Sequence, residues 1–316
     1  MPKKKIQIKK IKKKKKKTKK GMNVDDSKGY HIFNGLIHSA NTILVFFLAF
    51  SFVFSDQYST SIDLTSYGLS ILSALIFSIH PIHVSAVSEI SARPELLSSF
   101  FFLLSLLHYL HLNPDGGSVA PMVSFVPCIC LGCLAFLAKE SAMTIFFAVF
   151  LLEVLSPVKS LYSKSFRNKR VVLFLAASIS CLAFQKYWVG RLYPLAAFVD
   201  NPLPSSDLRT NVLTRSFILL YNLAITFFPF RYRADYTFNC FPMIQSFADR
   251  RNLLTLVVLL TIIYASRALK GRRLDKGLLI ILTVFILPIV PESNIFYPAG
   301  KIQDRGNGKR EKMPLG

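Results

Sequence analysis

A short segment of the chain carries five ionisable side chains within sixteen residues. It begins with His80-Pro81-Ile82-His83, at the end of an apolar run, and continues with Glu89, Arg93 and Glu95. Ionisable side chains are unfavourable inside a membrane and mark polar interfaces or functional sites. The proline predicts a kink between the two histidines. No third ligand has a spacing that matches the two imidazoles, so we predict no metal site. The alternative to a functional site is that the two histidines simply lie at the membrane interface.

A second pair of charges, Lys139 and Glu140, interrupts the 37-residue apolar stretch from Ala120 to Ser156. Neighbours on a helix point about 100° apart, so each of the two needs a different partner. A hairpin turn at the membrane surface would solvate both side chains. A buried Lys139 would instead suit the phosphate group of a lipid substrate. Both interpretations stay open.

A polar stripe runs along the first apolar segment. His31, Asn34, His38 and Asn41 are spaced 3, 4 and 3, which places them on one face of a helix. That face cannot be turned to lipid. It either makes hydrogen bonds to neighbouring helices or lines a wet cavity.

The elements that must position these residues are apolar runs close to the roughly 20 residues that a membrane crossing needs. Eight such runs are 33–54, 69–88, 96–112, 121–138, 141–156, 171–188, 253–268 and 277–294. We therefore predict an all-α fold, a polytopic bundle of membrane helices over residues 29–300. A ninth stretch, 213–230, carries Arg215 and Asn222 and ends at Pro229. We predict that it lies along the surface or re-enters without spanning.

The basic connectors orient the predicted helices. Connectors 157–170 and 267–276 are both rich in lysine and arginine, so the positive-inside rule places both in the cytoplasm. An even number of crossings then separates them, which leaves residues 189–252 largely luminal. Five crossings separate the N-terminal lysines from connector 157–170, so those lysines would be luminal, against the same rule. One further crossing before residue 31 would remove this conflict.

The net charge of +22 is concentrated at the N-terminus, where 13 of the 39 basic residues lie in the first twenty positions. This run lacks the arginines and aromatic residues of a nucleic-acid-binding domain, so we expect no nucleic acid partner. It predicts a disordered tail over residues 1–28, with a phosphoinositide-binding arm as the alternative. Residues 301–316 predict a second, polar tail. Three cysteines in 128–133 do not share a helix face and are interpreted as packing residues.

Several short motifs occur in a fixed order at the ends of the predicted helices. They are Gly29-Tyr30-His31 with Asn34 and His38, His80-Pro81-Ile82-His83, Ala92-Arg93-Pro94-Glu95, Ala138-Lys139-Glu140, Asp200-Asn201-Pro202, Arg215, Asp235-Tyr236 and Pro291-Glu292-Ser293-Asn294. In this order they resemble the transmembrane and tetratricopeptide-repeat-containing (TMTC-type) protein O-mannosyltransferases. The resemblance covers residues 29 to about 300.

The resemblance implies a GT-C-like glycosyltransferase membrane domain in the endoplasmic reticulum membrane. Enzymes of this type transfer mannose from dolichyl phosphate mannose to serine or threonine of secretory-pathway proteins, of the cadherin type. The implied partners are membrane lipid, a polyprenyl-phosphate sugar donor and an acceptor protein, with no cofactor besides the lipid donor. An acidic residue of the first luminal loop would act as base, and basic residues would stabilise the departing phosphate. The matching positions near the luminal cavity are His80, His83, Arg93, Glu95, Lys139 and Glu140.

The sequence also departs from the family pattern. The family's first helix and its acidic loop are expected before Gly29, where the lysine run stands, so the catalytic acid is not identified. Asp25-Asp26 lies too close to the following helix to match that loop. Ser85 stands where an acidic residue is common, and Ala92 replaces a usual glycine. No 34-residue repeat follows residue 300. We therefore expect truncation at both ends, and a non-catalytic membrane scaffold or lipid-binding fragment is the alternative function.

Overall fold

The computed structural model describes residues 27–54, 64–112, 120–155, 161–185, 187, 207–227, 243–257, 260 and 264. Within these ranges every regular element is helical and no strand occurs, so the all-α prediction is confirmed for this part of the chain. The α-helices are α2 (Ser27–Phe54), α3 (Leu64–Ile79), α4 (Val84–Ser88), α5 (Arg93–Leu112), α6 (Val126–Ala138), α7 (Thr144–Leu155), α8 (Leu161–Phe184) and α11 (Leu208–Phe227). Short 3-10 turns join some of them: η2 (Pro81–His83), η3 (Ile90–Ala92), η4 (Met122–Phe125) and η5 (Glu140–Met143).

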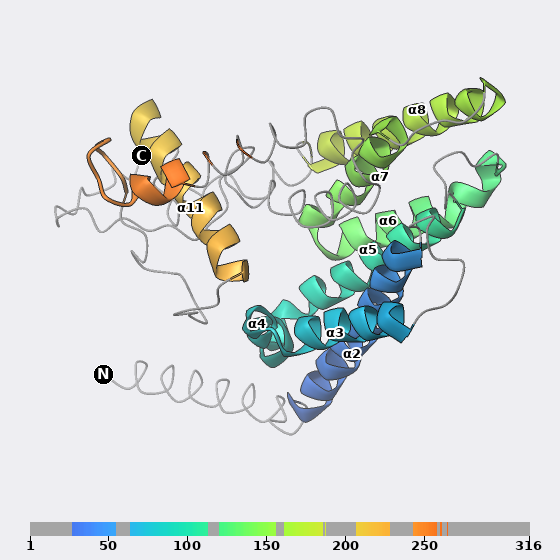
Figure 1. Ribbon diagram of the computed structural model, residues 1–316, viewed down its shortest axis with the longest axis horizontal. Coiled ribbons are helices and arrows are strands. Elements are labelled where there is room, and N and C mark those ends of the chain that lie inside the picture. Colours follow the sequence, from blue (N-terminus) through green and yellow to red (C-terminus); the bar gives the residue numbers. More distant parts are fainter. Residues whose placement is uncertain are drawn as a thin grey trace, which may run out of the picture.

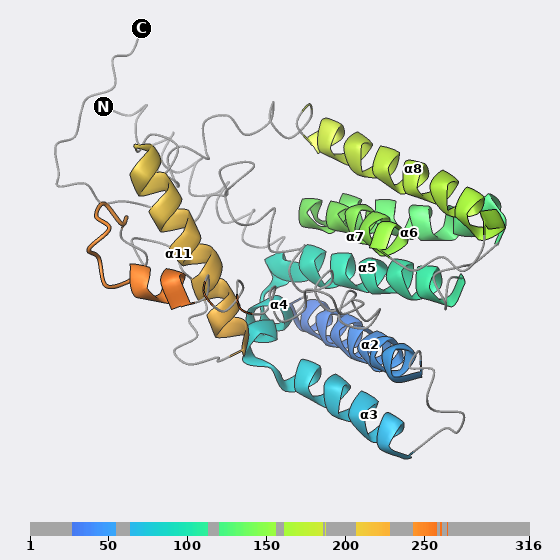
Figure 2. The same cartoon turned by 45° about the horizontal axis from the view of Figure 1, so that its top comes forward.

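Helices α2 to α8 form one bundle in which neighbours in sequence run in alternating directions (Figure 1 and Figure 2). Helix α2 packs between α3 and α5, α5 packs against α6, and α7 packs against α8. The alternation brings the α3–α5 junction and the α6–α7 junction to the same end of the bundle, whereas α8 begins at the opposite end (Figure 2). Helix α11 stands beside the bundle, with one of its ends near α4 in both views.

The core of the bundle is made by aromatic rings from three different helical segments. The fully buried rings of Tyr109, Phe125 and Phe174 contact one another, with centroids 6.1 to 6.4 Å apart. A second close contact joins α6 to α7. A Cβ atom on Gly132 would lie 2.7 Å from the ring of Phe146, so only glycine allows this approach. The sizes of the side chains at these positions therefore set how closely the helices pack.

Within the described ranges, two helical segments are long and apolar enough to cross a membrane, Lys28–Ser51 and Ile90–Leu112. A third is added if α3 and the segment Pro81–Ser88, which meet at a 45° bend, count as one span. The chain is therefore a membrane protein. Helices α6 and α7 have 13 and 12 residues. At 1.5 Å per residue each is about 18–20 Å long, short of a hydrocarbon core of about 30 Å.

Three expectations about the helices need correction or stay open. Run 69–88 was predicted to be one crossing with a kink at Pro81; α3 ends at Ile79 and the bend follows directly, so the run is either one bent span or a re-entrant pair. Connector 157–170 was expected to be a loop, but α8 begins at Leu161 and therefore includes all of it from that residue on. The predicted crossing 277–294, residues 1–26 and 301–316 of the two tails, and the motifs around Asn201, Tyr236 and Glu292 lie outside the described residues. Ser27 and Lys28, which were counted with the first tail, begin α2.

Candidate functional site

The break after α3 is formed by His80 and Pro81. The backbone of His80 is extended (φ −64°, ψ 127°), as sterics before proline require, and its Nδ1 accepts a hydrogen bond from the Ile82 N–H at 3.2 Å. Pro81 then occupies the first position of η2, where a missing N–H removes no helical bond. The kink predicted from the His-Pro sequence is confirmed, and the imidazole caps the turn that follows it.

An imidazole and aromatic cluster lies on the inner side of this break. The ring of His83 lies 4.4 Å from that of Phe77, 5.3 Å from that of His38 and 6.2 Å from that of His80, between centroids. His38 Nε2 donates to the Ser78 carbonyl at 3.1 Å, and within the described part of the chain its buried Nδ1 has no hydrogen-bond partner. No group of three metal-ligating side chains is found among the described residues. The cluster therefore fills the bend with rings.

The polar stripe of α2 donates hydrogen bonds to backbone carbonyls in the break after α3 and in the first turn of α5. Asn34 Nδ2 donates to the carbonyls of Val87 and Glu89, at 3.2 and 3.1 Å. Asn41 Nδ2 donates to the Leu96 carbonyl at 3.1 Å. A carbonyl without a donor is costly where no water is present, so these bonds fix the junction against α2. The contacts favour the helix–helix interpretation of the stripe. His31 differs from the other three residues of the stripe, because its side chain is exposed.

Arg93 begins α5, and its guanidinium lies over two aromatic rings in the first turns of α2. Its guanidinium carbon is 4.5 Å from the ring centroid of Tyr30 and 5.7 Å from that of Phe33, both within cation–π range. Its Nε is buried and has no hydrogen-bond partner among the residues that the structure describes. A guanidinium stacked in this way keeps its N–H edge in a fixed plane, which is the geometry that binds carboxylate or phosphate oxygens.

Lys139 connects the two junctions at this end of the bundle. Its Nζ lies 3.1 Å from Glu95 Oε1, and the two side chains are 30% and 47% exposed. Lys139 is extended (φ −149°, ψ 132°) between the end of α6 and η5, which begins at the half-buried Glu140. The prediction that Lys139 needs a partner other than Glu140 is confirmed, and the geometry is that of a hairpin turn. At this exposure the pair contributes at most about 1 kcal/mol, so it can be exchanged for another anion.

The sequence-based reasoning missed one ion pair, deep in the bundle. Glu153 on α7 and Arg170 on α8 are both fully buried and joined by two hydrogen bonds, Nε to Oε1 at 2.6 Å and Nη2 to Oε2 at 3.2 Å. The guanidinium also lies 5.4 Å from the ring of Phe125. Arg170 had been assigned to a basic connector, which is wrong. The signal that was available is Glu153, a lone carboxylate within an apolar run, which needs a cation.

Comparison with known proteins supports the resemblance drawn from the motifs. The family model "Protein O-mannosyl-transferase TMTC, DUF1736" matches residues 193–263. The chain is 32% identical over 241 residues to "Protein O-mannosyl-transferase TMTC2" of Homo sapiens, covering 72% of this chain and 27% of the relative. It is 27% identical to TMTC3 of Mus musculus over 294 residues, covering 86% of this chain and 30% of that relative.

The chain belongs to the TMTC family. A third relative, TMTC4 of Mus musculus, is 27% identical over 307 residues and is covered over 41% of its length. The chain thus spans between about a quarter and two fifths of these TMTC proteins. No solved structure matches it. The TMTC family model coincides with α11 and the segment after it, whereas the candidate residues from His80 to Glu140 lie outside the residues that this model matches.

Proposed function

We propose that this TMTC chain is a multi-pass, GT-C-like membrane domain of a protein O-mannosyltransferase in the endoplasmic reticulum. It would transfer mannose from dolichyl phosphate mannose to serine or threonine of secretory-pathway proteins, including cadherin-type proteins. The names of its relatives support the reaction class. The observation that carries the assignment to residues is the Glu95–Lys139 contact, which joins two helix interruptions at one end of the bundle.

Helix interruptions at one end of a membrane bundle favour a polar site. Backbone that leaves the helical pattern is tolerated at membrane depth only where it is buried in protein or lines a water-filled space. The α3–α5 junction meets this condition on its inner face through the hydrogen bonds from Asn34 and His38. Its outer side carries the exposed Glu89 and Glu95. The polar groups at this end are therefore held on a fixed backbone, as a binding site requires.

Arg93 and Lys139 suit the phosphate of the lipid donor. In the reaction, the acceptor hydroxyl oxygen forms a bond to C1 of mannose and the bond from C1 to the phosphate oxygen breaks. Negative charge grows on the departing dolichyl phosphate, where fixed cations stabilise it. Arg93 is positioned by Tyr30, and Lys139 can leave Glu95 for a phosphate oxygen at little cost. The base that takes the hydroxyl proton is not assigned.

Donor binding and transfer are measured separately. The purified chain in detergent is titrated with fluorescent dolichyl phosphate mannose, and transfer of labelled mannose to a cadherin domain is followed by mass spectrometry. We expect Arg93→Ala and Lys139→Ala each to weaken donor binding about tenfold, the loss of one charge-assisted contact. Arg209→Ala is the matched control, because Arg209 is an exposed cation at the start of α11.

The outcomes separate the proposal from its alternative. Equal donor affinity of wild type, Arg93→Ala and Lys139→Ala would show that the phosphate is not bound here. Donor binding without transfer, also in a longer chain extended at its N-terminus, would indicate a lipid-binding scaffold. Neither binding nor transfer in either chain would refute the transferase assignment.

A further inference from the structure

Residues 243–252 form a turn that packs on α11 and carries an exposed phenylalanine, Phe247, at its tip. On one side the turn is fixed by Ile244, which is fully buried against Phe217 and Ile218 of α11. The Ile244 N–H also donates to Thr214 Oγ1 at 2.9 Å. On the other side Arg251 lies 5.8 Å from the ring of Phe217. Both ends of the turn are therefore attached to α11.

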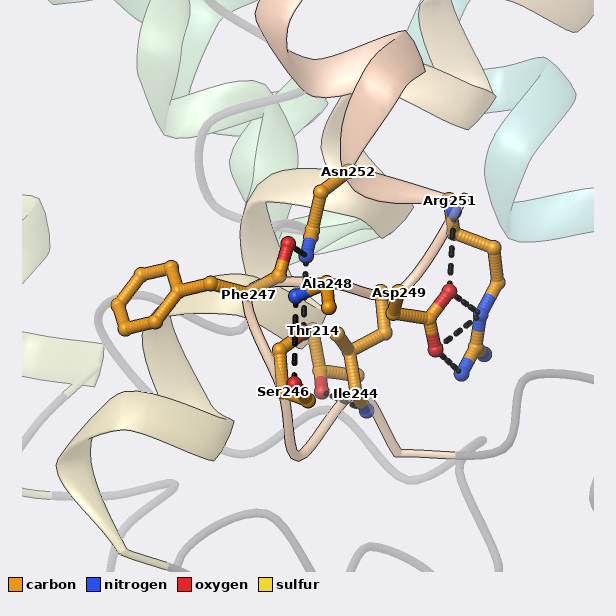
Figure 3. Close-up of polar contacts among 8 residues, drawn as sticks. All are labelled: Thr214, Ile244, Ser246, Phe247, Ala248, Asp249, Arg251 and Asn252. Carbon is orange, nitrogen blue, oxygen red and sulfur yellow. Dashed lines mark hydrogen bonds and ion pairs between the residues drawn. The ribbon is translucent and has the colours of Figure 1, made fainter.

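Hydrogen bonds within the turn leave little freedom to its backbone (Figure 3). Asp249 accepts from the Arg251 N–H at 2.9 Å and pairs with the Arg251 guanidinium at 2.6 Å. Asn252 Nδ2 donates to the carbonyls of Ser246 and Phe247, both at 3.0 Å. The Ala248 N–H donates to Ser246 Oγ at 3.2 Å. These contacts do not involve the side chain of Phe247, which points away from the Asp249–Arg251 pair in Figure 3.

The tip and the outer face of the next helical residues are apolar. Phe247 is 72% exposed, and exposed apolar side chains continue at Leu253, Leu256, Val257, Leu260 and Tyr264. Their spacing of 3, 1, 3 and 4 places them on one helix face. The other face packs on α11 through Leu254. An apolar face of this kind on a membrane protein is suited to lipid tails. The tip residue Phe247 lies six positions before Leu253, and the exposed cation Arg250 lies midway between them.

We propose that this turn is an interfacial anchor, in which Phe247 enters the border between headgroups and acyl chains while Arg250 reaches lipid phosphates. Aromatic rings and arginines at the ends of membrane segments occupy this position. The partner is thus the bilayer that holds α2 and α5. The anchor would set the position of α11 relative to the membrane surface. Helix α11 and the turn both lie within residues 193–263, which the TMTC family model matches. This inference does not depend on the transferase reaction.

The single tryptophan of the chain, Trp188, makes a direct test possible. The protein carrying Trp188→Phe and Phe247→Trp is reconstituted in liposomes that contain phospholipids brominated near the headgroup or near the chain end. We expect a blue-shifted emission that is quenched several-fold more by the shallow bromines than by the deep ones. The control carries Trp188→Phe and Arg209→Trp, a site flanked by the polar residues Asp207 and Thr210, and should respond mainly to aqueous acrylamide.

Equal acrylamide quenching of both reporters, with no effect of brominated lipid, would overturn the proposal. Protection of Phe247→Trp by added acceptor protein instead of lipid would overturn it too, since the tip would then bind a protein. If the reporter protein does not fold, the unaltered chain is photolysed in bilayers with a lipid that carries a diazirine near its headgroup. Cross-links within residues 243–250 are expected, and their absence beside cross-links on α2 would contradict the anchor.

Discussion

Removal of one partner of the Glu153–Arg170 pair should destabilise the bundle far more than removal of an exposed ion pair. Both side chains are 0% exposed, and the two hydrogen bonds are 2.6 and 3.2 Å long. At an effective dielectric constant of about 20, unit charges about 4 Å apart attract by about 4 kcal/mol. Glu153→Leu or Arg170→Met leaves the other charge buried without its counter-ion. The expected loss of unfolding free energy is about 3–5 kcal/mol.

The double variant, Glu153→Leu with Arg170→Met, distinguishes a lost attraction from a loss of packing. When both substitutions are present, neither charge of the pair remains buried, and a methionine side chain can keep the contact with the ring of Phe125. Replacement of a buried pair by apolar residues of similar size is close to neutral. The double variant should therefore be more stable than either single variant. The loss of unfolding free energy in the double variant should then be several kcal/mol smaller than the sum of the two single losses, whereas losses at distant sites add.

Thermal unfolding in detergent, followed by circular dichroism of the helices, measures these differences. At about 2–4 °C per kcal/mol, each single variant should lower the Tm by about 6–20 °C. The control is Glu95→Gln, which breaks a pair whose side chains are 30% and 47% exposed and should cost less than about 1 kcal/mol. The reasoning is refuted if Glu153→Leu lowers the Tm no more than Glu95→Gln, or if the double variant loses the sum of the single losses.

Three further predictions concern other parts of the chain. Gly132→Ala should destabilise by about 1–3 kcal/mol, because the new Cβ would lie 2.7 Å from the ring of Phe146, and Phe146→Leu in the same chain should restore part of the Tm. Asn41→Leu should cost about 1 kcal/mol in the same assay, since the Leu96 carbonyl loses a buried donor, and no loss would contradict that bond. The Arg251 side chain and N–H lower the pKa of Asp249 from 3.8 to about 2, so the contribution of this contact to stability is complete above about pH 4 and is lost as the pH falls towards 2. The carboxyl carbon shift of Asp249, measured by NMR, should have its midpoint near 2, whereas a midpoint near 3.8 would show that the contact is absent in solution.

Features set by local geometry could be predicted from the sequence. The periodicity of α2 placed Asn34, His38 and Asn41 on one face, and their three sets of hydrogen bonds go to the segment from Ser78 to Leu96. The sterics of proline placed the break at His80-Pro81. The expectation that Lys139 contacts a residue other than its neighbour Glu140 is met by Glu95. Each of these inferences needs only a few consecutive residues and the pitch of a helix.

Pairings between distant residues could not be predicted in this way. Glu95 and Lys139 are 44 positions apart, and their contact depends on how α5 packs against α6. Arg170 was counted with the other cations of its connector, because the positive-inside rule weighs number and not position. Helix α8 in fact begins nine residues earlier, at Leu161, so that Arg170 lies in its third turn and faces Glu153. A rule for topology therefore misplaced a residue that stabilises packing.

The two kinds of polar residue in this bundle have different consequences for function. Asn34, His38 and Asn41 donate to backbone carbonyls around the broken helix, so they hold the junction in one conformation. Arg93 and Lys139 lie on that junction or next to it, but they are held by ring faces and by a half-exposed carboxylate, which a ligand can replace. If Arg93 and Lys139 bind the donor phosphate as proposed, the anion would replace only their weak contacts, while the inner hydrogen bonds keep the backbone of the break in place.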